Sequence, residues 1–188
     1  FSGYSQTVIE FDWMDFYENW EGERYFEWLR QEFEEIAEIV LIDSRTGVTE
    51  IGGVCTYQMA DCVLMCCAPN HQNLYGTREM ATQLLLPQLE DLRAGRPLDV
   101  IIVPSRVERS DSQMLDNFKD IFLDTFEGTP FPLGIDVEQL WDIGITYVPK
   151  YALAELVAIR EDREEELASA EVLASEFREL GELLLRIG

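Results

Sequence analysis

Lysine and histidine are scarce in this chain of 188 residues. Lys119 and Lys150 are the only lysines, and His71 is the only histidine. Lys and Arg total 14 against 37 Asp and Glu, which gives a formal net charge of −23. Phosphate backbones and anionic lipids bind to basic patches, so this charge disfavours sequence-independent binding to nucleic acid or to an anionic membrane. It suits a basic protein partner, or it simply keeps the protein soluble.

Long apolar runs are also lacking. No run approaches the ~18 residues that a membrane-spanning helix needs, and the N-terminal residues do not resemble a signal peptide, so we expect no membrane span. Apolar residues nevertheless make up 47% of the chain, enough for one domain with a sizeable core. Because the first residue is Phe1 and not Met, we expect a processed or truncated product.

Cysteine occurs at four positions: Cys55, Cys62, Cys66 and Cys67. Three of them lie in one apolar run, ADCVLMCCAP. Cys66 and Cys67 are adjacent and should face opposite sides of a strand, so we do not expect them to bridge each other. We predict reduced, buried core thiols, which indicates a reducing cytoplasm. A metal site that includes His71 is the alternative.

Four short apolar runs predict β-strands. They are IVLID (39–43), CVLMCCA (62–68), VIIVP (100–104) and ITYVP (145–149). Their residues are mostly β-branched or aliphatic and do not alternate with polar ones. This pattern is typical of strands that are buried on both faces, as in a parallel sheet.

Helical periodicity appears between and beyond these runs. It predicts helices over about 23–37, 73–94, 111–126 and from Tyr151 onward, with a kink or split at Pro87. The aromatic residues of the first helix should pack on a sheet, and an exposed partner surface is the alternative. Strands that alternate with helices predict an α/β fold: a doubly wound, mostly parallel sheet flanked by helices, with a helical C-terminal segment.

The C-terminal segment, residues 151–188, holds ten acidic and four basic residues and is therefore acidic, with a net charge of −6. Its apolar stripe should pack on the preceding α/β domain, residues 1–150, or on a partner.

Ligands of open parallel sheets bind beyond the carboxyl ends of the strands. The four predicted strands are followed by DSRTG, PNHQNLYG, PSRVERS and PKY. We expect these loops to converge on one edge of the sheet and to form the functional site.

Asp43 stands at the end of the first predicted strand. A carboxylate in that position holds Mg²⁺ in P-loop nucleotide hydrolases, often through water. Gly47 would then let the backbone approach a γ-phosphate. The alternative is that Asp43 has a structural role, as a cap or as the ion-pair partner of Arg45.

Three stretches, IVLIDSRTGVTEIGG, ADCVLMCCAPNHQNLYG and DVIIVPSRVER, resemble the second half of ParA/MinD-like P-loop ATPases. The resemblance covers roughly residues 10–155. It implies that Asp43 coordinates Mg²⁺ through water and that Gly47 lies in the switch that senses the γ-phosphate. It also implies that Pro104, Ser105 and Arg106 lie near the base of a bound ATP.

The chain departs from that family in one respect. No GxxxxGK[ST] phosphate loop occurs in it, and neither lysine lies in a glycine-rich turn. One hypothesis is therefore a nucleotide-binding switch that binds and hydrolyses ATP with Mg²⁺ once another segment or chain supplies the loop, and that acts on a protein partner or as a homodimer. The other is a non-catalytic, acidic protein-interaction module that retains the fold.

Overall fold

The computed structural model describes residues 10–44, 53–93, 95–109, 112–154 and 167–187. It divides into two compact units. The first unit comprises Phe1–Asp61 and Asp91–Arg96, and the second comprises Cys62–Glu90 and Pro97–Gly188. The sequence predicts a different boundary, after residue 150, between part of an ATPase-like domain and the C-terminal helical segment. That boundary stays a prediction.

In its described residues, the first unit contains the helices α2 (Trp13–Asn19) and α3 (Gly22–Ile36) and the π-helical turn η1 (Val54–Met59). Asp12 caps α2, because its side chain accepts a hydrogen bond from the backbone N–H of Asp15. Ring contacts join the two helices, with Phe26 of α3 stacked on Trp13 of α2 at a centroid distance of 6.3 Å. The helix predicted over residues 23–37 is confirmed as α3.

Gly22 occupies the tight corner between α2 and α3. A Cβ atom at this position would lie 2.5 Å from Cδ1 of Phe16 and 3.1 Å from its backbone oxygen. The Phe16 ring cannot easily move aside, because it contacts the rings of Tyr25 and Phe26. The absence of a side chain at Gly22 therefore allows the two helices to pack closely.

The strand predicted over residues 39–43 is wrong. Residues 39–44 form no regular secondary structure, and Leu41 is 84% exposed. A strand needs a neighbour for its backbone N–H and C=O groups, and no strand pairs with this segment in the part of the chain that the structure describes. Asp43 therefore does not end a buried strand.

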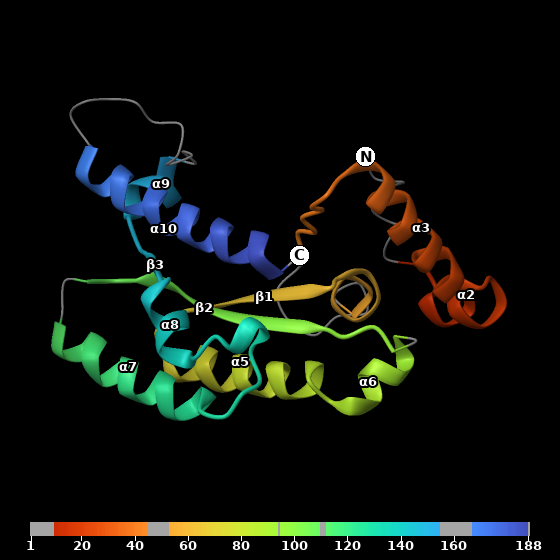
Figure 1. Cartoon of the computed structure of the whole chain (residues 1–188), viewed down its shortest axis with the longest axis horizontal. Coiled ribbons are helices and arrows are strands. Elements are labelled where there is room, and N and C mark those ends of the chain that lie inside the picture. Colours follow the sequence, from red (N-terminus) through yellow and green to blue (C-terminus); the bar gives the residue numbers. More distant parts are fainter. Residues whose placement is uncertain (1–9, 45–52, 94, 110–111, 155–166, 188) are drawn as a thin grey trace. The chain divides into compact units, whose positions relative to one another are not determined.

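The second unit is built on three parallel strands in the order β1-β2-β3 (Figure 1). They are β1 (Cys62–Cys67), β2 (Asp99–Val107) and β3 (Ile145–Thr146). The other three predicted strands are thus confirmed, although β3 is shorter than its sequence pattern indicates. A mixed α/β fold with a small parallel sheet is confirmed as well. The doubly wound order of a larger sheet stays a prediction.

Helices follow each strand. They are α5 (His71–Leu84), α6 (Pro87–Leu92), α7 (Ser112–Phe126), α8 (Val137–Asp142), α9 (Pro149–Ala154) and α10 (Leu167–Ile187), with a short 3₁₀ turn, η2, at Pro132–Gly134. The predicted split at Pro87 is confirmed, since α5 ends before it and α6 begins at it. Within the described ranges, no helix is both long enough and apolar enough to span a bilayer.

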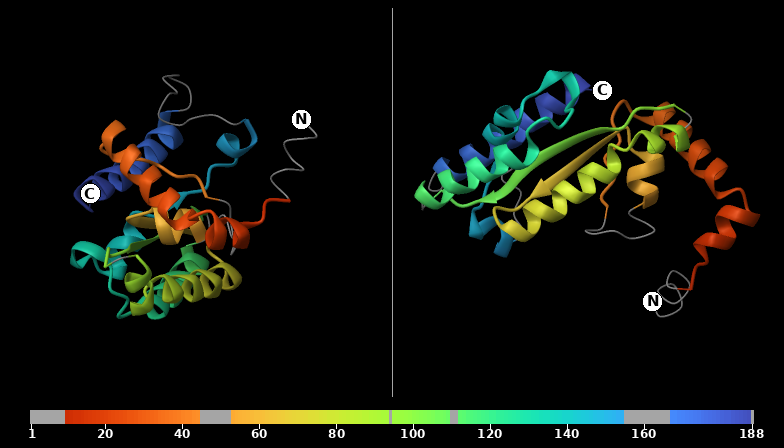
Figure 2. Two further views of the ribbon diagram at one scale, coloured as in Figure 1. Left: turned by 90° about the vertical axis from the view of Figure 1, so that its right-hand side faces the viewer. Right: turned by 90° about the horizontal axis from the view of Figure 1, so that it is seen from below.

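Strand β2 is the centre of the core. Its residues Val100, Ile101, Ile102 and Val103 are completely buried. Ile101 and Val103 pack with Leu140 of α8 and with Leu180 and Leu183 of α10. Figures 1 and 2 show α10 on one side of the sheet and α5 and α7 on the other. The predicted burial of both faces is therefore confirmed for β2.

Strand β1 differs from β2, because Leu64 and Cys66 are exposed while Met65 and Cys67 are buried. The pairing register places Leu64 and Cys66 beside Ile101 and Val103, on the face where Leu180 and Leu183 of α10 pack against β2. Burial on both faces is therefore a wrong prediction for β1, and a buried thiol is a wrong one for Cys66. The prediction that Cys66 and Cys67 face opposite sides is confirmed.

We predict that Gly22→Ala lowers the free energy of unfolding by about 1–3 kcal/mol, because the methyl group overlaps the Phe16 ring. Urea unfolding followed by circular dichroism measures the change. The matched control is Gly76→Ala in α5, where a Cβ would meet nothing within 4 Å. This control should stabilise by about 0.5–1 kcal/mol, since it removes a glycine from a helix interior. Equal stabilisation by both substitutions would contradict the packing argument.

Candidate functional site

A hollow of about 490 Å³ lies at the carboxyl ends of the three strands. It is lined by Cys66, Ala68, Pro69, Asn70, Asn73, Ser105, Arg106 and Tyr147. These residues come from the end of β1, the loop that follows it, the first turn of α5, the end of β2, and the residue after β3. The loops predicted after the second and third strands therefore meet here, together with Tyr147 of the fourth predicted strand, and the hollow is the candidate site.

Asn70 and Asn73 shape one wall of this hollow where α5 begins. The Oδ1 atom of Asn70 accepts hydrogen bonds of 2.9 Å from the backbone N–H and from the side-chain amide of Asn73. Asn70 is thus the N-cap of α5 and is held in extended conformation by that role. The wall presents amide groups in fixed positions.

Arg106 has a strained backbone. Its φ angle is +57°, in the left-handed region, and it lies inside β2 where the pairing with β3 shifts between Ser105 and Val107. A side chain other than glycine costs about 1–2 kcal/mol in this conformation. The guanidinium lies over the Tyr147 ring, 4.9 Å from its centroid. The irregular register thus directs a cation onto an aromatic ring at the hollow.

The charge of the hollow contrasts with that of the chain. Arg106 is a cation among the lining residues, and none of the lining residues that the structure describes is an aspartate or glutamate. In a protein with a net charge of −23, this local pattern favours an electron-rich or anionic ligand.

Of the three residues predicted to lie near the base, Ser105 and Arg106 line the hollow. Pro104 does not. It is fully buried and packs so closely on Gly144 that a Cβ there would lie 3.3 Å from the Cβ of Pro104. Pro104 therefore supports the site from the core, because β2 continues through Val107 and does not end at Pro104.

The cysteines of the site are poor candidates for chemistry. Although Cys66 is partly exposed to solvent, desolvation by the surrounding protein atoms raises the pKa of its thiol, so this thiol stays protonated at neutral pH and is a weak nucleophile. His71 stacks on Tyr75 at a centroid distance of 6.3 Å. The described residues contain no group of three or more His, Cys, Asp or Glu side chains arranged to hold a metal ion.

Asp43, the residue predicted to hold Mg²⁺, is not among the residues that line this hollow. Asp43 belongs to the first unit, and its side chain is exposed. Gly47 and Arg45 lie outside the described residues. The catalytic roles of Asp43 and Gly47 and the metal role of Asp43 stay predictions.

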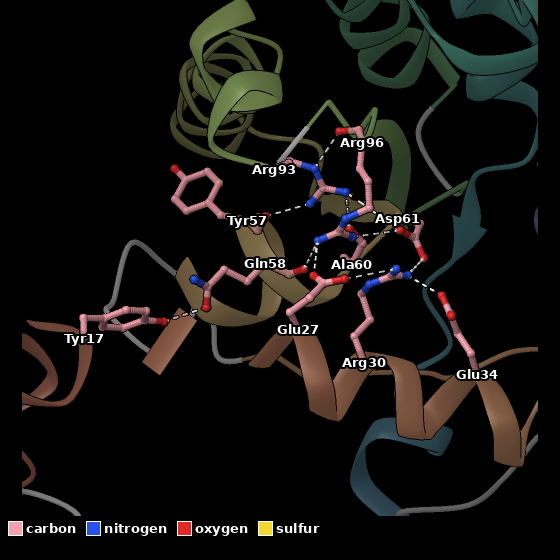
Figure 3. A network of polar contacts seen from close by, with 10 residues as sticks. All are labelled: Tyr17, Glu27, Arg30, Glu34, Tyr57, Gln58, Ala60, Asp61, Arg93 and Arg96. Atoms are coloured by element: carbon pink, nitrogen blue, oxygen red, sulfur yellow. Dashed lines mark hydrogen bonds and ion pairs between the residues drawn. The ribbon is translucent and has the colours of Figure 1, made fainter. Parts of the chain in front are cut away.

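A second hollow, of about 750 Å³, lies in the first unit. Arg93 is buried at its wall and donates to three backbone carbonyls (Figure 3): Tyr57 at 2.7 Å, Ala60 at 2.8 Å and Arg96 at 3.0 Å. Burial lowers the pKa of Arg93, and the three carbonyls compensate its charge. The Arg93 guanidinium therefore joins separate segments of the chain and does not face a ligand.

The neighbouring cations are engaged in the same way. Arg96 pairs with Glu27 at 3.0 Å and with Asp61 at 3.5 Å, and its guanidinium also donates to the carbonyl of Gln58 at 3.1 Å. Arg24, which also lines this hollow, pairs with Glu21 at 3.2 Å. This hollow is larger than the first, but its arginines are used internally, so we consider it structural.

Asn70, Asn73 and Tyr147 are site residues that the sequence pattern does not single out. An asparagine just before a helical pattern is a recognisable N-cap signal, which could have identified Asn70. Tyr147 has no such signal, because it lies in the apolar run ITYVP and its position depends on the pairing of β3 with β2.

Comparisons of the chain with protein-family models, with curated proteins and with solved structures find no match. Its function therefore has to be inferred from the chemistry of the hollow and from the sequence.

Arg106 allows a test of the strained site. We predict that Arg106→Gly melts at or above the temperature of the unchanged protein, because glycine relieves the positive φ. Arg106→Ala should be less stable than Arg106→Gly, since alanine keeps the strain while the contact with Tyr147, about 0.5–1 kcal/mol, is lost in both variants. Thermal unfolding followed by circular dichroism measures the order.

Arg178 is the matched control, an exposed residue inside α10. There the order should reverse, with alanine more stable than glycine by about 1 kcal/mol. If alanine is also the more stable residue at position 106, the backbone there is not strained.

Proposed function

We propose that this chain is part of a ParA/MinD-like nucleotide-binding switch, which binds and hydrolyses ATP with Mg²⁺ when a phosphate loop completes it. The observation that supports the proposal is the hollow at the carboxyl edge of the parallel sheet, where Ser105 and Arg106 meet the loop after β1. Open parallel sheets bind nucleotides at this edge.

The chemistry of the hollow suits a nucleotide base. Its volume, about 490 Å³, falls in the range of roughly 300–1,000 Å³ that is typical of small-molecule sites. Tyr147 and the planar guanidinium of Arg106 offer flat surfaces for an aromatic base, and Ser105 offers a hydroxyl for its polar edge. The lining carries no carboxylate among the described residues, so the phosphates of a nucleotide meet no negative charge there.

The phosphate end of the site has to come from elsewhere. The chain has no glycine-rich loop with a lysine, which would hold the β- and γ-phosphates by its amides and its ammonium group. We propose that another segment or chain supplies this loop. In the completed site Asp43 would hold Mg²⁺ through water, and Gly47 would sense the γ-phosphate.

The same proposal extends to the sheet. In the described part of the chain, β1 has a neighbouring strand only on the side of β2. We expect β1, β2 and β3 to belong to a larger, doubly wound sheet in which a further strand covers the outer edge of β1. A cytoplasmic location and a nucleotide-controlled protein partner or homodimer are part of this proposal.

A second candidate function is a non-catalytic, acidic interaction module. The net charge of −23 and the exposed aromatic residues of α3, such as Trp28, favour it. The two candidates differ in what they require of the hollow, because only the first needs it to bind a ligand.

Nuclear magnetic resonance can test the hollow on the 188-residue chain as it exists. We expect adenosine to bind with weak, millimolar affinity and to shift the amide signals of Ala68, Ser105 and Tyr147, and Arg106→Ala should abolish the shifts. Because the sequence has no glycine-rich phosphate loop, Mg-ATP should bind with an affinity within about threefold of that of adenosine. A tenfold difference would correspond to about 1.4 kcal/mol.

The results of this experiment distinguish the two candidate functions. Absence of shifts at the hollow, or shifts located elsewhere, would reject the base site and favour the interaction module. Micromolar binding of Mg-ATP would show that this chain holds the phosphates itself, and would overturn the proposed need for a separate phosphate loop.

Asp43→Asn tests the Mg²⁺ role. Since Asp43 is exposed and lies outside regular secondary structure, the free energy of unfolding should change by less than about 0.5 kcal/mol. In the protein completed by its phosphate loop, Mg²⁺-dependent ATP hydrolysis should fall by roughly tenfold or more, about 1.4 kcal/mol in the barrier. A destabilised fold with normal hydrolysis would instead assign Asp43 a structural role.

A further inference from the structure

Helix α3 carries an exposed stripe of mixed apolar and acidic residues, which we call the α3 stripe. Its members are Tyr25, Trp28, Glu32, Glu35 and Ile36. The others follow Tyr25 at spacings of three, seven, ten and eleven residues, which places them along one face of a helix. Trp28 is 50% exposed and Ile36 78%, which is high for such large apolar side chains.

The inward side of α3 already has its partners. Phe26 packs against Trp13 and Tyr17 of α2, with centroid distances of 6.3 Å to each ring. Glu27 pairs with Arg96 and Arg30 with Glu34 (Figure 3). The helix is therefore fixed in the first unit by this face. The α3 stripe lies on a different face, except that the Tyr25 ring at its N-terminal end also contacts Phe16 of α2, at a centroid distance of 5.9 Å.

The carboxylates of the stripe differ from their neighbours on the same helix. Glu27 and Glu34 are paired with arginines, as is Glu21 just before the helix. Glu32 and Glu35 have no cationic partner among the residues that the structure describes. Two uncompensated carboxylates thus lie between Trp28 and Ile36, in a protein that already carries a charge of −23.

We propose that the α3 stripe docks a basic amphipathic helix of a protein partner. Trp28, Tyr25 and Ile36 would receive its apolar residues, and tryptophan and tyrosine are the side chains that most often anchor such contacts. Lysine or arginine beside those apolar residues would meet Glu32 and Glu35. The stripe spans about 16 Å of helix, which matches three turns of a partner helix.

Charge favours a basic partner helix on the α3 stripe over a second copy of the chain or an anionic membrane. A second copy of the chain would bring Glu32 and Glu35 toward the same carboxylates on a symmetric interface, and like charges repel. An anionic membrane would be repelled for the same reason. The proposal concerns the first unit alone, whereas the nucleotide proposal concerns a hollow in the second, so either can fail without the other.

The test uses the whole 188-residue chain and a designed probe. The probe is an 18-residue peptide of leucine and lysine, with leucine at helical spacing. One comparison peptide has serine in place of leucine, and another has glutamate in place of lysine. Calorimetry should show binding of the leucine–lysine peptide, at least about tenfold weaker binding of the serine peptide, and none of the glutamate peptide.

Variants locate the binding. Trp28→Ala should weaken the leucine–lysine peptide by about tenfold or more, as expected for an anchor residue. The double variant Glu32→Gln and Glu35→Gln should weaken it and reduce its dependence on salt concentration, because fewer charges are screened. Glu32 and Glu35 are exposed, so the double variant should retain the fold. It therefore tests the proposal even if Trp28→Ala fails to fold.

A matched control separates the stripe from the overall charge. Asp116→Asn with Asp120→Asn removes two exposed carboxylates four residues apart on α7 and should change the affinity by less than about twofold, as for charges remote from an interface. Equal weakening by this control would show that the peptide follows net charge alone and would overturn the proposal. A dimer of the chain that Trp28→Ala dissociates, measured by sedimentation, would overturn it in favour of a second copy.

Discussion

Val100, Ile101, Ile102 and Val103 have no solvent-accessible surface, so both faces of β2 must be covered for the second unit to exist. Burial of each such side chain contributes about 1.5–3 kcal/mol, and no other strand of the sheet has a comparable run. The rest of the unit follows from this requirement. Helix α10 supplies Leu180 and Leu183 to one face, and helices α5 and α7 lie across the other (Figures 1 and 2). The candidate site depends on it too, because Ser105 and Arg106 lie in the same strand directly after its buried run.

Arginine side chains have two different kinds of surroundings in this acidic protein. In the first unit, arginines are surrounded by backbone carbonyls and carboxylates, and they bind separate segments together. At the hollow of the second unit, Arg106 faces an aromatic ring and its backbone is strained. Strain at a position that is open to a ligand is typical of sites selected for binding rather than for stability. The distribution of arginines therefore distinguishes the two hollows better than their volumes do.

The sequence predicts the second unit better than the first, for physical reasons. A continuous apolar run such as VIIVP buries all of its side chains only when both faces of the strand are covered, so it predicts a central strand. Helices such as α3 and α7 show a clear helical periodicity of apolar residues. Both kinds of element are therefore predicted correctly. The IVLID run has the same composition but no pairing partner in the described chain, and composition cannot reveal that. Ser105 and Arg106 line the hollow because the carboxyl ends of parallel strands share one edge, and their predicted place near a base stays a prediction. Tyr147 and the backbone strain of Arg106 depend on a register shift between β2 and β3, which no local pattern encodes.

The path of the chain has a consequence for any attempt to divide the protein. The backbone crosses between the two units three times, after Asp61, after Glu90 and after Arg96. Limited proteolysis at one of these junctions therefore cannot release two complete halves. A fragment that stops at Asp61 would also lose Arg93, and the carbonyls of Tyr57 and Ala60 would lose the guanidinium that joins them. The first unit is therefore complete only when residues 91–96 are present. They can be included by keeping the intervening residues 62–90 in the same fragment, or they can be added as a separate peptide.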